Sequence, residues 1–107
     1  LFSDKMRLPT LIFDEIDSGT SGKVANVIGD LMKKIGFESQ IIAISHLAQV
    51  AAKASNHFKV YKILSSNKPK TLLRKLNHEE RIEEIAAMIS ADNITNPALD
   101  QAIELLK

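Results

Sequence analysis

The sequence predicts an α/β fold in which a parallel strand–helix–strand unit comes first and a β-hairpin and two closing helices follow. Two short apolar runs, residues 10–13 and 40–45, flank a segment with helical periodicity, which is the pattern of a right-handed βαβ crossover. A turn-rich stretch at residues 65–70 separates two further strand-like segments. With 107 residues, the chain makes one domain or a part of one.

Composition excludes several classes of protein. Hydrophobic residues make up 45% of the chain and charged residues 25%, close to the globular average, so wholesale disorder is not expected. No apolar run approaches the roughly 18 residues of a membrane helix, and the charged start does not resemble a signal peptide. The absence of cysteine excludes a disulfide framework, thiolate metal sites and thiol catalysis, and it fits a reducing cytoplasm.

The net charge of +1 hides an uneven distribution. Residues 53–75 contain no Asp or Glu, and an acidic stretch follows from Glu79 onward. A basic stripe can contact phosphates, but such a pattern is more often a solvated hairpin with lysines on its outer face. Charge alone therefore does not establish nucleic-acid binding. The basic residues of this segment are Lys53, Lys59, Lys62, Lys68, Lys70, Arg74 and Lys75.

The first part of the chain is expected to form the parallel unit. Residues 1–9 are a lead-in, and residues 10–13 and 40–45 are strands of the kind that is buried on both faces of a sheet. After a loop at residues 18–22, Ser21 is placed to cap a helix and Gly36 to end it at the C′ position. The expected apolar stripe of that helix consists of Val24, Val27, Ile28, Leu31 and Ile35.

A short helix and then a hairpin are expected next. The hairpin strands are predicted over residues 57–64 and 71–76, with a loose loop over residues 65–70 between them. The apolar stripe expected for the short helix consists of Leu47, Val50, Ala51 and Ala54.

Two capped helices are predicted to close the chain. Asn77 and Glu80 have the spacing of a capping box, and Asn96 followed by Pro97 resembles a cap with proline at the first helical position. The expected apolar stripes are Ile82, Ile85, Ala86 and Ile89 in the first helix, and Leu99, Ala102, Ile103 and Leu106 in the second.

Two adjacent acids, Asp14 and Glu15, follow the first strand and are the most informative candidates for chemistry. Ligands of open parallel sheets bind just outside the carboxyl ends of the strands. One acid there can hold a magnesium ion bound to a nucleotide while the other orients or deprotonates water. The alternative is a helix N-terminus that favours acids, because an apolar run followed by Asp-Glu is a weak motif by itself.

His46 directly follows the second strand, so it is expected beside the two acids if the strands are neighbours. It could donate a hydrogen bond to a terminal phosphate, or it could be a helix cap, a role that Ser45 could also take. His57 and His78 have weaker claims, and no His-Glu-x-x-His spacing occurs.

Residues 18–24 superficially suggest a phosphate-binding P-loop. The motif requires four residues between its glycines and a Ser or Thr after the lysine. Only two residues separate Gly19 from Gly22, and Val24 follows Lys23. The segment is therefore rejected as a Walker A motif, and no other segment supplies one.

Taken together, four segments in this order resemble the C-terminal end of the RecN family of bacterial DNA repair proteins, which belongs to the SMC-like branch of the ABC-type ATPases. The resemblance extends from about residue 8 onward, and the combination is far more specific than any one motif. The segments are Leu-Ile-Phe-Asp-Glu-Ile-Asp-Ser-Gly-Thr-Ser-Gly (11–22), Ile-Ser-His-Leu-Ala-Gln-Val-Ala-Ala (44–52), His-Phe-Lys-Val-Tyr-Lys (57–62) and Glu-Arg-Ile-Glu-Glu-Ile-Ala-Ala-Met-Ile (80–89).

The resemblance implies a role for each site residue. Residues 11–14 would be the Walker B strand, with Asp14 supporting Mg²⁺ through water, and Glu15 would be the catalytic carboxylate that positions the attacking water. His46 would be the switch histidine that contacts the γ-phosphate of ATP. The D-loop, which reaches across a head-to-head homodimer, would comprise residues 17–21, including Asp17, Ser18, Gly19 and Ser21.

The resemblance also implies that the chain is a fragment, the distal part of an ABC-type P-loop ATPase head. The family's Walker A motif, Q-loop, coiled coil and signature motif all lie upstream of the matching segments. The fragment alone is therefore expected to be inactive until the N-terminal half of the head joins it. The closing stretch with Thr95 is present, but Ser90-Ala91-Asp92 stands where the family often has Gly-Gly.

The implied function is ATP-dependent head dimerisation and hydrolysis in DNA double-strand-break repair and recombination. The intact protein would bind ATP, Mg²⁺ and DNA in the bacterial cytoplasm, associated with the nucleoid and not with a membrane. Two alternatives stay open: the head of another SMC-like or ABC-type ATPase, and a non-catalytic binding or assembly module that works through the basic hairpin.

Overall fold

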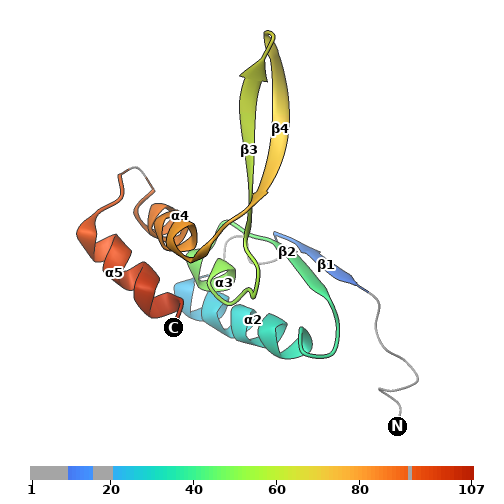
Figure 1. Cartoon of the computed structure of the whole chain (residues 1–107). Helices are drawn as coiled ribbons and strands as arrows, with labels where there is room; N and C mark the ends of the chain where they lie inside the picture. The colour runs from blue at the N-terminus through green and yellow to red at the C-terminus, as the bar shows by residue number, and fades with distance from the viewer. Residues whose placement is uncertain (1–9, 16–20, 92) are drawn as a thin grey trace.

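The computed structural model describes residues 10–15, 21–91 and 93–107, and the elements follow the predicted order (Figure 1). A long hairpin rises from a body built of helices and a small parallel sheet. The elements are β1 (Leu11–Asp14), α2 (Gly22–Ile35), β2 (Ile41–Ile44), α3 (Ala48–Ala51), β3 (Phe58–Ser65), β4 (Lys68–Lys75), α4 (His78–Ser90) and α5 (Asn96–Leu105).

β1 and β2 pair in parallel, as predicted, with Leu11 opposite Ile41 and Asp14 opposite Ile44. The Leu11 N–H donates to the Gln40 carbonyl at 2.9 Å where the pair begins. The expectation that both faces are buried was wrong. The α2 side is covered, whereas Ile12 on the other face is 66% exposed and Ile42 and Ile44 are also exposed.

α2 buries a different stripe from the one predicted. Its buried residues are Ala25, Gly29 and Met32, whereas Val24, Val27 and Leu31 of the predicted stripe are exposed. Small residues face α3 because the two helices approach closely: a Cβ on Gly29 would lie 3.1 Å from the Gln49 carbonyl oxygen. The stripe was predicted from the most hydrophobic residues, whereas the buried face of α2 is the one whose side chains are small enough for α3 to approach.

The ends of α2 are partly as predicted. The Ser21 side chain accepts from the Val24 N–H at 3.4 Å, which confirms the cap. Gly36 is the C-cap in right-handed helical conformation (φ −62°), not a left-handed C′ residue. Its N–H bonds the Met32 carbonyl at 2.8 Å, so the helix ends without using the conformational freedom of glycine.

β3 and β4 form an antiparallel hairpin, but the loose loop expected over residues 65–70 was wrong. The strands continue until Ser65 pairs with Lys68, and only Ser66 and Asn67 form the turn. Both turn residues have positive φ, 51° and 64°, as a type I′ turn requires. A turn of this type matches the twist of the two strands. Pro69 has no backbone N–H to donate, and it is tolerated because the outer edge of a two-stranded ribbon pairs with no further strand.

The base of the hairpin is fixed to α4 by side chains. Lys59 forms an ion pair with Glu84 at 2.7 Å, and Arg74 forms another with Glu80. His57 is half-buried at this junction; burial lowers the pKa of its imidazole, and the charge of Arg81 lowers it further. The hairpin therefore leaves the body in a direction set by α4.

α4 and α5 pack against α3 to form the larger core. The capping box of Asn77 and Glu80 is present as predicted, with both hydrogen bonds formed. The cap of α5 is Thr95, one residue before the predicted Asn96, and its hydroxyl accepts from the Ala98 N–H at 3.2 Å. Ile103 of the predicted stripe is exposed. The buried residues of this core are Ala48, Ala52, Ile85, Ala86, Ala98 and Ala102.

Ala91, the C-cap of α4, has φ +66° and ψ −51°, a sparsely populated conformation that costs a residue with a Cβ about 1–3 kcal/mol. We expect Ala91→Gly to raise the free energy of unfolding of the full-length protein by about 1 kcal/mol. The same change at Ala87, inside the helix, should lower it by about 1 kcal/mol. Denaturant melts of the two variants test this, and equal destabilisation by both would contradict it.

Candidate functional site

The parallel register brings three of the predicted site residues to one edge of the sheet. Asp14 ends β1 opposite Ile44, and the Glu15 N–H donates to the Ile44 carbonyl at 2.8 Å, which closes the pair. His46 follows two residues after Ile44. Asp14, Glu15 and His46 therefore leave the carboxyl ends of neighbouring strands, where ligands of parallel sheets bind.

Glu15 has an unusual backbone. Its φ is +53°, in the left-handed region that residues other than glycine, Asn and Asp seldom adopt. This conformation costs about 1 kcal/mol and ends the strand sharply. Because strained positions of this kind gather at functional sites, the strain is a second reason to assign chemistry to Glu15.

Both carboxylates are exposed, so they can reach a ligand without a burial cost. Mg²⁺ in proteins is typically held by one or two carboxylates together with waters and substrate phosphates. The pair of Asp14 and Glu15 fits that donor set. In the described part of the chain, no three or more His, Cys, Asp or Glu side chains are arranged so that they could hold a metal ion by themselves.

His46 is exposed and takes none of the structural roles considered for it. The N-cap of α3 is Leu47, without a side-chain cap, and the Ser45 hydroxyl accepts from the Leu47 N–H at 3.0 Å. His46 is therefore neither the helix cap nor a core residue. Of the other histidines, His57 supports the base of the hairpin and His78 lies exposed at the start of α4.

Of the predicted D-loop, residues 17–21, the structure describes only the last residue, Ser21. Ser21 caps α2 through its hydroxyl, next to the segment that joins β1 to this helix. Asp17, Ser18 and Gly19 lie outside the described residues. Binding roles for these four residues stay predictions.

A shallow cleft of about 200 Å³ lies elsewhere, between the base of the hairpin and α4. None of its lining residues belongs to the edge of the parallel pair, and two ion pairs, of Lys59 with Glu84 and of Arg74 with Glu80, span it. Four of the five charged side chains that line the cleft are paired with one another, so we interpret it as the junction between the hairpin and α4.

Sequence reasoning missed Arg81, a residue of α4 that joins this helix to the end of α3. Its guanidinium Nη2 donates to the carbonyls of Ala51 at 3.3 Å and Ala54 at 2.9 Å, and so fastens α4 to the end of α3. α3 begins two residues after His46, and Arg81 holds its other end. No local signal in the sequence identifies it, because the partners are backbone carbonyls 27 and 30 residues away.

The chain is similar to curated proteins that are each named DNA repair protein RecN. It is 47% identical to the one from Rickettsia conorii over 103 residues, 40% to that from Haemophilus influenzae over 106 and 37% to that from Bacillus subtilis over 107. These alignments take in 96%, 99% and 100% of this chain but 19% of each relative, so the chain spans about a fifth of their length.

The fold has a solved counterpart. A chain from work on the ATP-driven dimerisation and DNA-stimulated activation of SMC ATPases matches with a TM-score of 0.57 at 22% identity, covering 77% of this chain and 48% of that one. The predicted fold, an α/β arrangement with a parallel strand pair, an antiparallel hairpin and two closing helices, is thereby confirmed. No family model matches the chain. Given the identity to the RecN relatives over nearly all of its residues, this chain belongs to the RecN family and corresponds to the C-terminal part of those proteins.

Proposed function

We propose that this segment completes an ATP-hydrolysing head in a DNA repair protein. The observation that carries the proposal is the edge of the parallel pair, where Asp14, Glu15 and His46 leave neighbouring strands. Two acids and a histidine at such an edge can hold a metal, activate water and contact a phosphate.

Each residue takes a distinct step in the proposed reaction. Mg²⁺ supplies positive charge to the phosphates of bound ATP. Asp14 would hold that ion through a bound water, and Glu15 would orient the attacking water and accept its proton. His46 would donate a hydrogen bond to the γ-phosphate, whose charge shifts as the water oxygen bonds to the γ-phosphorus and the bond to the ADP leaving group breaks. The segment from Asp17 to Ser21 would face a second head.

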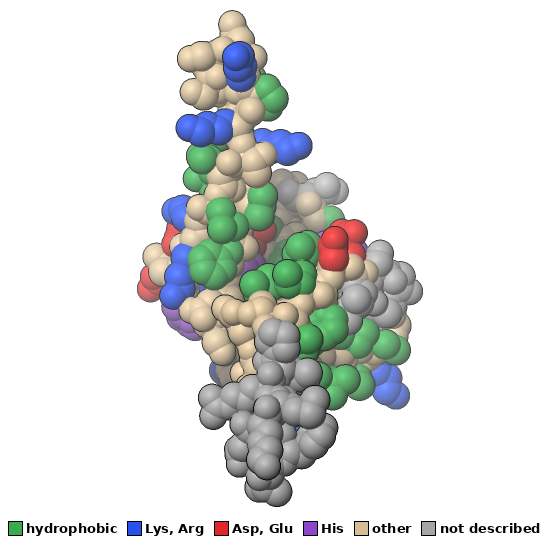
Figure 2. Space-filling model, turned by 90° about the vertical axis from the view of Figure 1, so that its right-hand side faces the viewer, with side chains coloured by type: hydrophobic (Ala, Val, Ile, Leu, Met, Phe, Trp, Pro, Cys, Tyr) green, Lys and Arg blue, Asp and Glu red, His purple; other side chains and the backbone are tan. Residues whose placement is uncertain are grey.

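The rest of the head is the first partner of this segment. A two-stranded hairpin by itself is only marginally stable in water, so it needs another element to pack against. Phe58, Val60 and Leu73 lie on one face of this hairpin and are exposed. Hydrophobic side chains gather on this side of the molecule, on the hairpin and below it (Figure 2). We propose that the remaining part of the same polypeptide covers them together with the open face of β1 and β2.

The intact protein would form a head-to-head homodimer with ATP and act on DNA in double-strand-break repair. Its proposed location is the bacterial cytoplasm, at the nucleoid. Among the described residues, no helix has the length and apolar character to cross a membrane.

The isolated chain of residues 1–107 should not hydrolyse ATP at a useful rate, whereas the full-length protein should. Phosphoryl transfer needs a phosphate cradle, usually glycine-loop amides and a lysine, and no Walker A motif occurs in these 107 residues. Steady-state phosphate release from both proteins, purified in parallel, tests this. The isolated chain would contradict the proposal that the phosphate cradle lies elsewhere in the polypeptide if it hydrolysed ATP and if Glu15→Gln abolished that hydrolysis.

A further inference from the structure

The basic side chains of the hairpin fall into two groups. At its base, Lys59 and Arg74 are neutralised by acids of α4. Lys75, also at the base, is exposed and forms no ion pair with the described residues, and the same holds farther out for Lys62, Lys68 and Lys70. Two basic side chains thus fasten the hairpin to α4, and the lysines of its outer half have no acid partner among the described residues.

The outer lysines lie in a segment without acids. The chain contains no Asp or Glu between Glu38 and Glu79, and the outer half of the hairpin projects away from the helices that carry the acids (Figure 1). Charges that stand unneutralised on a narrow projection attract an anionic partner, and low ionic strength strengthens that attraction.

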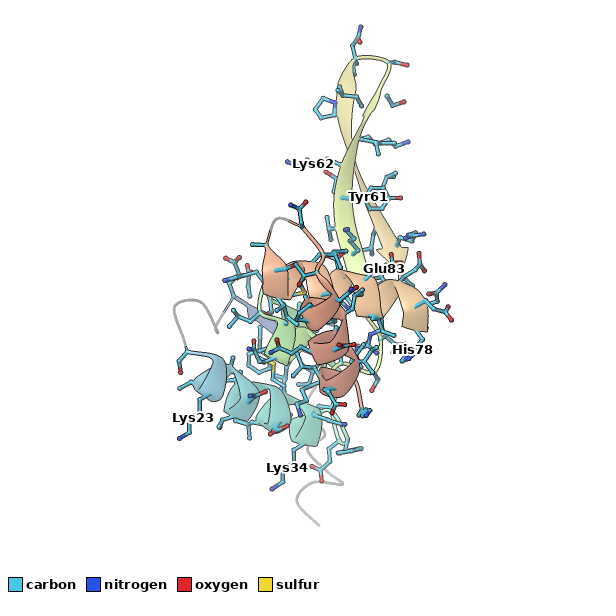
Figure 3. All side chains as sticks on the ribbon, turned by 90° about the vertical axis from the view of Figure 1, so that its left-hand side faces the viewer. Lys23, Lys34, Tyr61, Lys62, His78 and Glu83 are labelled. Carbon is cyan, nitrogen blue, oxygen red and sulfur yellow. The ribbon has the colours of Figure 1, made fainter. Side chains whose placement is uncertain are left out.

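The lysines occupy both faces of the ribbon. In the hairpin register, Lys62 lies opposite Thr71, whereas Lys70 and Lys68 lie opposite Ile63 and Ser65, so Lys62 is on one face and the other two on the opposite face. Lys62 and its neighbour Tyr61 accordingly point to opposite sides of the hairpin (Figure 3). One positively charged face would be enough to bind a flat anionic surface, but this ribbon carries positive charge on both of its faces.

We propose that the outer half of the β3–β4 hairpin binds the phosphate backbone of double-stranded DNA. The major groove, about 12 Å wide, admits a two-stranded β-ribbon and has phosphates along both walls. Lysines on both faces can reach both walls. Lys68 and Lys70 are two residues apart, about 6.8 Å, which equals the axial rise of two phosphates along one strand. Contacts of this kind are independent of base sequence.

This inference rests on the proposed function, since it takes DNA as the partner of the intact protein. The test uses the full-length protein and a fluorescent 30-base-pair duplex of random sequence, with affinity measured by anisotropy between 50 and 200 mM salt. The variant is Lys68→Gln with Lys70→Gln. Its control is Lys33→Gln with Lys34→Gln, which removes two exposed lysines from the end of α2, on the body of the molecule (Figure 3).

Each phosphate contact adds about 0.9 to the slope of log affinity against log salt. The hairpin variant should therefore lose about 1.8 from that slope and about 60-fold in affinity at 0.1 M salt, and adding Lys62→Gln should bring the loss in slope to about 2.7. The α2 control and a Lys68→Arg, Lys70→Arg variant should keep the wild-type slope. ATP hydrolysis without DNA should be unchanged in all of them.

Two results would overturn the inference: a wild-type slope in the hairpin variant, or an equal loss in the α2 control. If the wild-type protein itself failed to bind the duplex, the proposed action on DNA would fall together with this inference. Wild-type binding that survives the loss of the hairpin lysines would remove the hairpin contact alone and leave the proposed ATPase head intact.

Discussion

Replacing Glu15 with Gln in the full-length protein should lower ATP turnover by about 10²–10⁴-fold while ATP binding persists. The amide keeps the shape of the side chain but loses the charge and basicity that polarise the attacking water. Because the strained backbone of Glu15 stays the same, the loss reports on the carboxylate itself. Hydrolysis that stalls after binding should also trap ATP-bound dimers. Single-turnover hydrolysis, nucleotide binding and size-exclusion chromatography with ATP measure the three effects.

Glu38→Gln is the matched control for this change. Glu38 is exposed in the loop that leads into β2, at the opposite end of the parallel pair from Glu15, so its replacement should leave turnover unchanged. Asp14→Asn should differ from both, because it should weaken Mg²⁺-dependent binding or chemistry. Normal turnover by the Glu15→Gln variant would remove the assigned role from Glu15.

His46→Ala should lower turnover by about 10²–10³-fold with little change in melting temperature. The hydrogen bond to the γ-phosphate would strengthen as charge shifts in the transition state, so its loss acts on the chemical step. Stability should change by less than about 0.5 kcal/mol, because the side chain is exposed and caps no helix. Thermal melting and single-turnover hydrolysis on the same full-length preparation test both statements.

His78→Ala serves as the control for His46, since it removes an exposed histidine from the start of α4. It should leave the single-turnover rate unchanged. A His46→Ala protein that is destabilised but hydrolyses ATP at the normal single-turnover rate would make His46 a structural residue. That result would also weaken the assignment of the neighbouring acids, because the three residues are assigned by their common edge.

Features that depend on neighbours in the sequence were predicted well. The Asn77–Glu80 capping box and the Ser21 cap formed as expected, since each involves atoms three residues apart. The parallel pairing of β1 with β2 followed from chain order and the handedness of the crossover. That pairing placed Asp14, Glu15 and His46 at one edge, so this part of the candidate site could be predicted as well.

Errors arose where two local solutions were nearly equal. The turn of the hairpin could have been a six-residue loop, but cross-strand pairing extended both strands until only Ser66 and Asn67 remained. The cap of α5 could have been Asn96 or Thr95, both of which favour that position, and the structure has Thr95 there. In each case the difference in local free energy is small, and contacts made elsewhere decide the outcome.

The sequence by itself determined the element order, the Ser21 cap, the Asn77–Glu80 capping box and the parallel unit, because these depend on local periodicity and chain direction. The tertiary structure decided which face of each element is covered. α2 has two apolar faces, and the close approach of α3 selected the one with Ala25 and Gly29. The structure alone also showed that Lys59 and Arg74 pair with acids of α4, whereas the lysines of the outer half of the hairpin lie beyond the reach of those acids. Burial and pairing depend on residues far apart in the chain, and no local pattern records them.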